Sequence, residues 1–318
     1  MCPRTGSLVG VAVAAVITAV AAGAASVGDP GQEASLAVRN PRGWSTWWRS
    51  GAAPASWNGD RRLARRVSWH LGAAGIEWGE VQLRGSSEAW RTRVIVARID
   101  PEKVRFALVP AFTRNTNWTI ASADSTVTLA LDAGQFRGRL PWGWVVTRGK
   151  EVLVPQYAPL AGAVLVDSSG TVRIVAPDSV AGERERGTAE EAFQSYPMLL
   201  LNGTVPAALR KAGSGVDLTH RDARLALGTL DDGRVIVALT RFDALGPSLG
   251  RVPFGLTTPE MAAVMGGLGA RNALLLDGGI SGQLLLRSSD GSLRTWPGTR
   301  AVPLGLEVRS RDMTPLRP

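Results

Sequence analysis

The chain alternates short apolar runs with short polar turns, most clearly from Ile76 onwards. A representative run is Val94-Ile95-Val96-Ala97, and a representative turn is Asp100-Pro101-Glu102-Lys103. Apolar runs of about four to eight residues bounded by such turns are typical of β-strands. The segments that we expect to be strands are residues 90–99, 104–109, 127–131, 142–147, 152–155, 163–166, 172–175, 221–228, 235–239, 274–276 and 284–286.

Helical periodicity is scarce and is strongest over residues 259–265. Thr258 is suited to cap this helix, Pro259 is suited to its first turn, and the glycines from Gly266 onwards should end it. Shorter helices are expected near residues 61–71, 122–126 and 190–193. The charged segment 183–187 is expected to be a solvated, mobile loop. Many short strands with a few covering helices predict an α+β fold of mostly antiparallel strands.

The first residues follow the pattern of a secretory signal. Arg4 supplies a positive charge, and residues 8–25 form an uncharged apolar stretch that ends in small residues. Residues 1–26 are therefore expected to be a cleaved signal peptide or an anchor that associates the protein with a membrane. In either case we expect the protein to be exported: periplasmic, extracellular or anchored facing outward. The remaining chain is expected to divide into a linker at 27–75, a single domain at 76–310 and a tail at 311–318.

Composition narrows the class of protein. Hydrophobic residues make up 45% and charged residues 20%, as in a globular protein with a full core, and the lone Cys2 allows no intrachain disulfide. The net charge is +9, but no nucleic-acid-binding pattern accompanies the scattered basic residues. We therefore expect no nucleic-acid partner and favour an acidic substrate or envelope polymer. The tryptophans of the linker are expected to pack on the domain, lie at a membrane interface or stack on sugars.

A polar turn between two apolar runs, residues 277–283, is the most informative segment of the chain. It begins with a carboxylate, Asp277, followed by Gly278 and Gly279, and it also contains the hydroxyl of Ser281. Consecutive glycines let the backbone turn sharply and let a ligand approach its N–H groups. A carboxylate at the end of a buried strand is well placed for a binding or catalytic site. The alternative is an ordinary glycine-rich hairpin with an aspartate in its turn.

Six segments, in order along residues 76–310, resemble the motifs of the phosphodiester glycosidase family. They are Ala130-Leu131-Asp132-Ala133-Gly134-Gln135-Phe136, Pro197-Met198-Leu199-Leu200-Leu201-Asn202-Gly203, Arg224-Leu225-Ala226-Leu227-Gly228, Leu256-Thr257-Thr258-Pro259-Glu260, Asp277-Gly278-Gly279-Ile280-Ser281 and Arg300-Ala301-Val302-Pro303. The resemblance implies an enzyme that hydrolyses a sugar-1-phosphodiester or a related envelope glycan. The sequence departs from the family motifs at Asp132, Gln135, Leu225 and Ile280.

The resemblance and the residue chemistry together suggest a site. Arg224 would bind phosphate in bidentate fashion, with the N–H groups of Gly278 and Gly279 and the hydroxyl of Ser281 beside it. Asp277 would face the positively charged sugar of the transition state, with Asp132 as the second carboxylate.

Each candidate also has a structural alternative. Asp277 would then cap its own turn, and Arg224 would form an ion pair, with Asp277 as one partner. Ser281 would bond the turn, and His220, which could also touch substrate, would bond its own loop. No cofactor or metal is expected, because no dense ligand spacing supports a divalent cation shared by Asp132 and Asp277. The functional alternative is a non-catalytic glycan-binding or structural envelope protein on the same scaffold.

Overall fold

The computed structural model describes residues 34–85, 91–211, 213, 216–243 and 252–311. The chain divides into two units, Met1–Ala34 and Ser35–Pro318, and all the elements below belong to the second. The expected signal peptide or anchor at residues 1–26 lies outside the described residues, as does the expected tail beyond Arg311.

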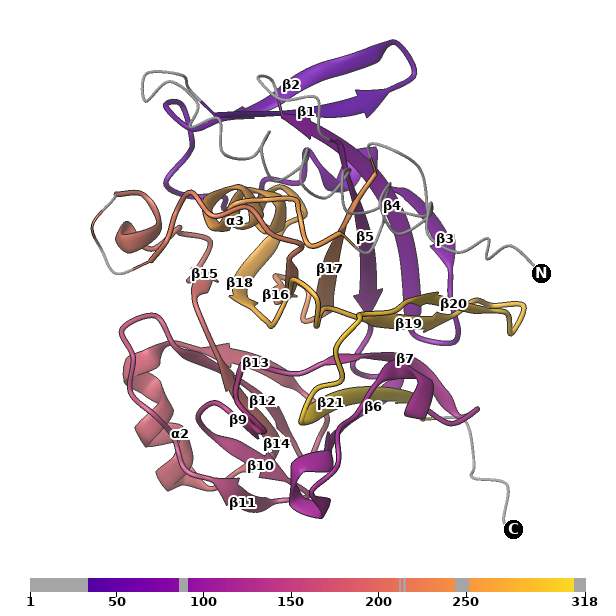
Figure 1. Cartoon of the computed structure of the whole chain (residues 1–318), viewed down its shortest axis with the longest axis vertical. Helices are drawn as coiled ribbons and strands as arrows, with labels where there is room; N and C mark the ends of the chain where they lie inside the picture. Colours follow the sequence, from indigo (N-terminus) through magenta and orange to yellow (C-terminus); the bar gives the residue numbers. More distant parts are fainter. Residues whose placement is uncertain (1–33, 86–90, 212, 214–215, 244–251, 312–318) are drawn as a thin grey trace, which may run out of the picture. The chain divides into compact units, whose positions relative to one another are not determined.

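The largest sheet has nine antiparallel strands, in the order β15-β18-β16-β17-β5-β4-β1-β2, with β3 pairing with β4 (Figure 1). Its strands are β1 Ser35–Asn40, β2 Gly43–Arg49, β3 Ser68–Leu71, β4 Ile76–Gly85, β5 Arg91–Ile99, β15 Met198–Leu200, β16 Leu225–Leu230, β17 Val235–Phe242 and β18 Ala270–Leu275. Strands β16 and β17 are buried along their whole length, which explains their near-continuous apolar sequence. A turn that contains Asp232 and Gly233 joins them.

Two five-stranded antiparallel sheets complete the domain. One has the order β11-β10-β14-β12-β13 and contains β10 Val145–Thr147, β11 Lys150–Leu153, β12 Gly162–Asp167, β13 Val172–Val175 and β14 Ala189–Ser195. The other has the order β20-β19-β7-β21-β6 and contains β6 Val104–Pro110, β7 Val127–Asp132, β19 Leu284–Arg287, β20 Leu293–Trp296 and β21 Leu304–Ser310. A two-stranded ribbon is formed by β8 Phe136–Arg137 and β9 Leu140–Pro141.

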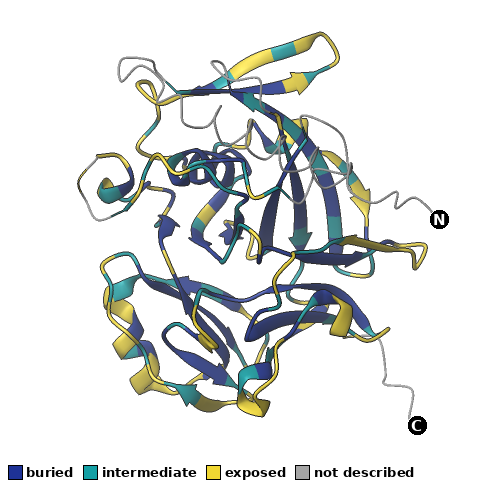
Figure 2. Cartoon of the chain, in the orientation of Figure 1, coloured by how far each residue is buried: buried dark blue, intermediate teal, exposed yellow. Residues whose placement is uncertain are grey.

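One hydrophobic core is shared by the three large sheets. Side chains from each of them, such as Ile95, Leu131 and Phe193, belong to a single buried cluster. Figure 2 shows the same distribution, with the strands mostly buried and the turns exposed. Because the described part of the chain folds around a shared core, it forms one domain, and its α+β class is the one expected from the sequence.

Two α-helices lie in the described residues: α2 Val180–Arg186 and α3 Thr258–Gly267. The strongest helix prediction is confirmed by α3, although Thr257 rather than Thr258 is its N-cap. The Thr257 side chain accepts from the N–H of Glu260, and the Glu260 carboxylate accepts from the N–H of Thr257, which makes a capping box. Short 3₁₀ helices span Ala64–Arg66, Ala111–Arg114, Ile120–Ser122, Pro177–Ser179 and Ala207–Leu209.

The expected linker at residues 27–75 is instead largely part of the domain. Strands β1, β2 and β3 extend the nine-stranded sheet, and Trp48 and Trp57 are buried in the core. Strand β1 contains few hydrophobic residues, and the segment 27–75 is rich in Gly, Pro and Ser. For this reason the pattern of apolar residues did not indicate strands there. The domain therefore begins at Ser35 rather than at residue 76.

Four shorter predictions of secondary structure are wrong. The expected helix at 61–71 is one 3₁₀ turn followed by β3, and the one at 190–193 lies within strand β14, which pairs with β10 and β12. The expected loop at 183–187 is mostly helix α2. Its Glu183 is buried and paired with Arg173, and Gly187 ends the helix in a left-handed conformation. The helix expected at 122–126 is reduced to the 3₁₀ turn that ends at Ser122.

Candidate functional site

The Asp277 turn connects two sheets rather than two strands of a hairpin. Strand β18 before it pairs with β15 and β16, whereas β19 after it pairs with β7 and β20. The N–H of Asp277 donates to the carbonyl of Gly134 at 3.0 Å, which brings the turn against the segment that follows β7. The hairpin alternative is therefore excluded, and the turn lies where two sheets and the loops at their ends meet.

The two glycines of the turn are required by close packing. A Cβ atom at Gly278 would collide with the carbonyl of Ala223, and one at Gly279 would lie 2.9 Å from the Asp222 carboxylate. Gly279 also has a φ of +55°, and its N–H donates to the Ala223 carbonyl at 2.7 Å. The N–H of Gly279 is thus used by the fold, and the turn packs directly on residues 222–223.

Ser281 makes hydrogen bonds within the turn, as its structural alternative predicted. Its side chain is buried, and its hydrogen bond to Asp277 favours the charged form of that carboxylate. The N–H of Ser281 donates to the carbonyl of Gly278 at 2.9 Å. Ser281 therefore fixes the orientation of Asp277.

Asp277 itself is a partly exposed, desolvated carboxylate. Burial raises the pKa of Asp277, and the negative charge of Asp222 raises it further. The hydrogen bond from Ser281 and the positive charge of Arg300 act in the opposite direction. A carboxyl group with a raised pKa can hold or accept a proton closer to neutral pH than an ordinary aspartate can.

Asp132 is too deeply buried to contact a substrate. Its side chain is 1% exposed. Oδ1 accepts from the N–H of Gln283 at 2.9 Å, and Oδ2 has no hydrogen-bond partner within the described ranges. Burial and the charge of Asp277 raise the pKa of Asp132 well above its ordinary value, although Arg241 opposes the shift. Asp132 is thus close enough to influence Asp277, but it is almost completely buried and binds the N–H of Gln283 at the end of the turn.

Asp222 is a second carboxylate at the site that the sequence motifs did not indicate. Its side chain is 25% exposed, and its Oδ2 lies 3.9 Å from Nε2 of His220. Burial raises the pKa of Asp222, while Arg224 and His220 lower it. Asp222 lies two residues before the family-like segment that begins at Arg224, and this position is the sequence signal that could have indicated it.

Arg224 is held mainly by backbone carbonyls. Its Nε donates to Leu256 at 2.9 Å and one Nη donates to His220 at 2.6 Å. Burial lowers the pKa of Arg224, and the charges of Asp222, Asp217 and Glu260 raise it. The guanidinium therefore ties the 220–222 loop to the segment before α3. The structural alternative of an ion pair with Asp277 finds no support here, because the cation that acts on Asp277 is Arg300.

Arg300 is an exposed cation at the site that sequence reasoning quoted but did not select. Its guanidinium lies over the ring of Phe136, 4.7 Å from the ring centre, and its charge lowers the pKa of Asp277. The N–H of Arg300 donates to the carbonyl of Ile280 at 3.1 Å, which places the two segments side by side. A phosphate approaching Asp277 would therefore meet an accessible guanidinium.

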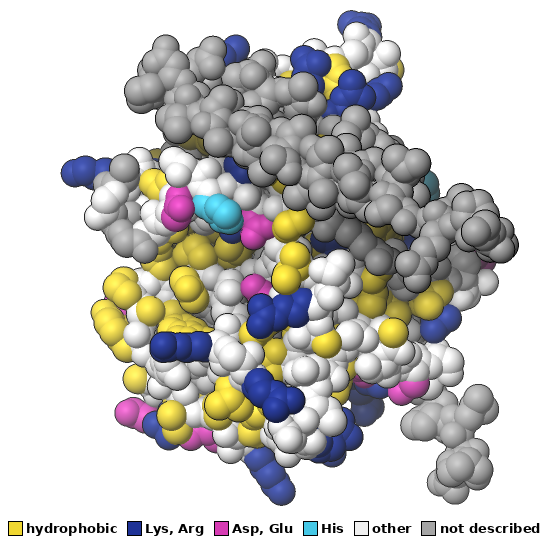
Figure 3. Space-filling view, viewed as in Figure 1, with side chains coloured by type: hydrophobic (Ala, Val, Ile, Leu, Met, Phe, Trp, Pro, Cys, Tyr) yellow, Lys and Arg dark blue, Asp and Glu magenta, His cyan; other side chains and the backbone are white. Residues whose placement is uncertain are grey.

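Two aromatic side chains flank the same region. The rings of Trp142 and Tyr196 are 5.4 Å apart, and Tyr196 is 45% exposed. Nε2 of Gln135 donates both to the carbonyl of Tyr196 and to that of Leu276, the residue before Asp277. Figure 3 shows a face on which a histidine and acidic side chains lie next to hydrophobic ones. Two carboxylates, a guanidinium and at least partly exposed aromatic rings thus lie in the same region of the domain.

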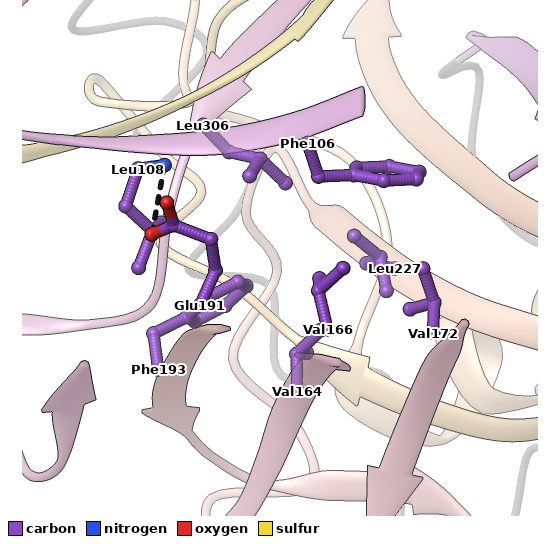
Figure 4. Close-up of a pocket in the computed structure, with 9 residues that line it drawn as sticks. All are labelled: Phe106, Leu108, Val164, Val166, Val172, Glu191, Phe193, Leu227 and Leu306. Carbon is purple, nitrogen blue, oxygen red and sulfur yellow. Dashed lines mark hydrogen bonds between the residues drawn. The ribbon is translucent and has the colours of Figure 1, made fainter. Parts of the chain in front are cut away.

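A small gap between the sheets is part of the core and carries no ligand site. It is lined by apolar side chains and by Glu191, whose carboxylate accepts from the N–H of Leu108 (Figure 4). Its volume is only about 10 Å³, too little for a substrate. Within the described residues, no cluster of three or more His, Cys, Asp or Glu side chains could hold a metal ion.

The sequence model of the phosphodiester glycosidase family matches residues 122–309. The chain therefore belongs to the phosphodiester glycosidase family, in agreement with the resemblance of its motifs. No curated protein matches the sequence. Of the helices in the described ranges, none has the length and apolar character to cross a membrane.

Two solved structures are similar to the chain. One is the catalytic domain of zebrafish N-acetylglucosamine-1-phosphodiester alpha-N-acetylglucosaminidase, auto-inhibited by its pro-peptide, with a TM-score of 0.56 and 15% identity over 80% of this chain and 92% of that one. The other is a hypothetical protein from Synechocystis, with a TM-score of 0.51 and 15% identity over 74% of this chain and 62% of that one. At such identities the likeness shows the fold.

Proposed function

We propose that the protein is an exported glycosidase that hydrolyses a sugar-1-phosphodiester, with Asp277 as its central carboxylate. The observation that carries the proposal is the setting of Asp277. It is a desolvated carboxylate in the turn that connects two sheets, and the charges of Asp222 and Arg300 act on it. Membership of the family supplies the reaction class, and the N-terminal signal pattern supports export.

The reaction breaks the bond between the anomeric carbon and the bridging oxygen, which leaves on the phosphate with the bonding electron pair. Water forms a new bond to the anomeric carbon and gives up a proton. The departing phosphate is already a stable anion, so the main need is for negative charge facing the positively charged sugar. Asp277 and Asp222 can share these tasks, one ionised against the sugar ring and the other accepting the proton of water.

Asp132 takes a different role from the one expected from the sequence. Because its side chain is almost fully buried, it is a positioning residue that holds the N–H of Gln283 and thereby the end of the Asp277 turn. Gly278 and Gly279 let that turn pack on the 222–223 segment, and Ser281 orients Asp277.

The phosphate is assigned first to Arg300, which is exposed, and second to Arg224 and His220. Arg224 has two of its nitrogens engaged with carbonyls, so it mainly positions the loop that presents His220 and Asp222. Guanidinium binds phosphate through a planar fork of donors, which a flexible ammonium cannot reproduce.

The sugar is assigned to the aromatic pair of Trp142 and Tyr196. Both are anchored next to Asp277 through Gln135, and aromatic faces offer apolar contact to the C–H groups of a sugar ring. These residues would orient the ring rather than take part in bond breaking.

Hydrolysis in ¹⁸O-labelled water tests the reaction class. The full chain is incubated with a panel of sugar-1-phosphodiesters, and both products are analysed by mass spectrometry. A glycosidase places the label in the sugar, because the bond to the anomeric carbon is broken. Label in the phosphate would mean phosphorus–oxygen cleavage and would overturn the proposal. If the protein binds glycans but hydrolyses no member of the panel, the non-catalytic alternative holds. The exposed Ile280, where the family turn has glycine, would then mark the loss.

A further inference from the structure

A polar hollow lies in the N-terminal part of the domain, formed by strand β2 and the 3₁₀ turn that follows it. Its volume is about 400 Å³, within the range of small-ligand sites. Its lining side chains are Val38, Ser45, Thr46, Trp47, Arg62, Arg65 and Arg66. Three guanidinium groups, two hydroxyls and an indole thus border one cavity, and no carboxylate is among the lining residues.

The charge of this region is unbalanced. Residues 34–71 contain seven arginines and one acidic residue, Asp60, a net charge of +6 within a chain whose total is +9. Asp60 is already paired with Arg62, at 2.8 Å. In the part of the chain that the structure describes, no ion pair joins Arg65 or Arg66 to a carboxylate. The hollow therefore presents two unneutralised cations.

The arginines are presented by a fixed piece of backbone. Leu63, directly before the 3₁₀ turn, is completely buried, and its N–H donates to the carbonyl of Gly267 at 2.9 Å. Nε1 of Trp69 donates to the carbonyl of Ala64 at 3.2 Å, which ties the turn to β3. Such anchoring lowers the entropy cost of holding the arginines around a ligand.

Trp47 is fixed on the other side of the hollow. Its ring packs closely on Gly267, where a Cβ atom would collide with it, and its centre lies 5.8 Å from that of Trp57. A partly exposed, closely packed indole beside guanidinium groups suits a ligand with an apolar ring face and an anionic substituent.

We propose that this hollow is a second binding site, specific for a phosphate-bearing sugar unit of an anionic glycan. The glycan part of the proposal rests on the proposed function, whereas the anion-binding part rests on the arginines alone. A hollow of this size admits one sugar and its phosphate, so it fits a polymer unit better than the flat surface of a membrane. It would hold a polymeric substrate while another unit occupies the Asp277 site.

Binding of a phosphorylated dextran, with unmodified dextran of the same length as reference, tests the site. Calorimetric titration of the full chain is carried out at about 0.1 M salt, where charges beyond roughly 10 Å are screened. We expect binding of the phosphorylated polymer only, and at least a tenfold loss of affinity in the variant Arg65→Gln/Arg66→Gln. The matched control is Arg105→Gln/Arg114→Gln, which removes the same charge from exposed positions elsewhere. It should lose less than threefold.

Three results would overturn the proposal. Equal losses in the two double variants would mean attraction by net charge alone. Tighter binding of single-stranded DNA or of anionic lipid vesicles than of phosphorylated dextran, lost in Arg65→Gln/Arg66→Gln, would assign the hollow to another ligand class. Loss of turnover on a short sugar-1-phosphodiester in that variant would place the arginines in the Asp277 site instead. If the Asp277→Asn protein still binds the polymer, the second binding site is supported whether or not the proposed glycosidase activity is correct.

Discussion

The variant Asp132→Asn should be more stable than the parent protein, and the difference should grow as the pH rises. Asparagine keeps an oxygen that can accept from the N–H of Gln283, and its amide replaces an Oδ2 atom that has no described partner. The substitution therefore changes little in the packing and removes only the ability to ionise. At low pH, where the parent carboxyl is protonated in both states, the two proteins should have similar free energies of unfolding.

The magnitude follows from proton linkage. The pKa of Asp132 is raised well above its ordinary value in the folded protein, so the folded state keeps a proton that the unfolded chain releases. Between the two pKa values the parent loses stability as the pH rises, by about 1.4 kcal/mol per pH unit for one proton. The asparagine variant lacks this loss, so its advantage should grow by that amount per unit, starting near pH 4.

Urea unfolding followed by tryptophan fluorescence, from pH 4 to pH 8, measures this difference. The chain contains eleven tryptophans, which gives a strong signal. Asp290→Asn is the control, because Asp290 is exposed in a turn and the Ser292 hydrogen bonds lower its pKa. A difference between Asp132→Asn and the parent that does not change with pH would show that Asp132 is ionised in the folded protein. The buried, protonated state would then be wrong.

Three further predictions concern stability and substrate contacts. Glu183 has a pKa lowered to about 2 by Arg173 and is 4% exposed, so Glu183→Gln should cost up to about 3 kcal/mol at neutral pH. That gap should close as the pH falls from 4.5 towards 2 in chemical unfolding; a gap independent of pH would contradict the ion pair. Gly278→Ala should lower the free energy of unfolding by about 1–3 kcal/mol, because the added Cβ atom would collide with the backbone of Ala223. Gly182→Ala, in helix α2, leaves room for the Cβ atom and should raise the free energy of unfolding by up to about 1 kcal/mol. Arg300→Lys should lower kcat/KM for a phosphodiester about tenfold or more relative to a neutral aryl glycoside, whereas Arg224→Lys should lower the melting temperature and affect both substrates equally. The opposite pattern in these two variants would return the phosphate to Arg224.

The sequence predicted well those elements whose patterns are local. Strand β17 is a continuous apolar run, and α3 carries its own cap and proline, so both could be located from a few residues. The linker prediction failed because residues 35–49 show no clear alternation of apolar and polar residues. They form a local β1–β2 hairpin, and only the pairing of β1 with β4 joins it to the domain.

The candidate site shows the same division. The Asp277 turn could be selected from its glycines and its flanking strands, but its neighbours could not. Asp132 precedes a similar glycine, and only the pairing of β7 with β19 shows that its side chain is buried rather than partly exposed like that of Asp277. Asp222 and Arg300 gain importance because backbone contacts at Gly279 and Ile280 bring them to Asp277. Such proximity between distant segments is not encoded in any single motif.

The central claim is that Asp277 is the carboxylate on which turnover depends. The most direct test is kcat/KM of Asp277→Asn for a sugar-1-phosphodiester that the parent hydrolyses, with Asp290→Asn as the exposed-turn control. The backbone contact from Asp277 to Gly134 is kept in the variant, so its melting temperature should remain close to that of the parent. We predict a loss of about 10²- to 10⁴-fold for Asp277→Asn and none for Asp290→Asn. An Asp277→Asn protein that turns over substrate at the parent's rate would contradict the account.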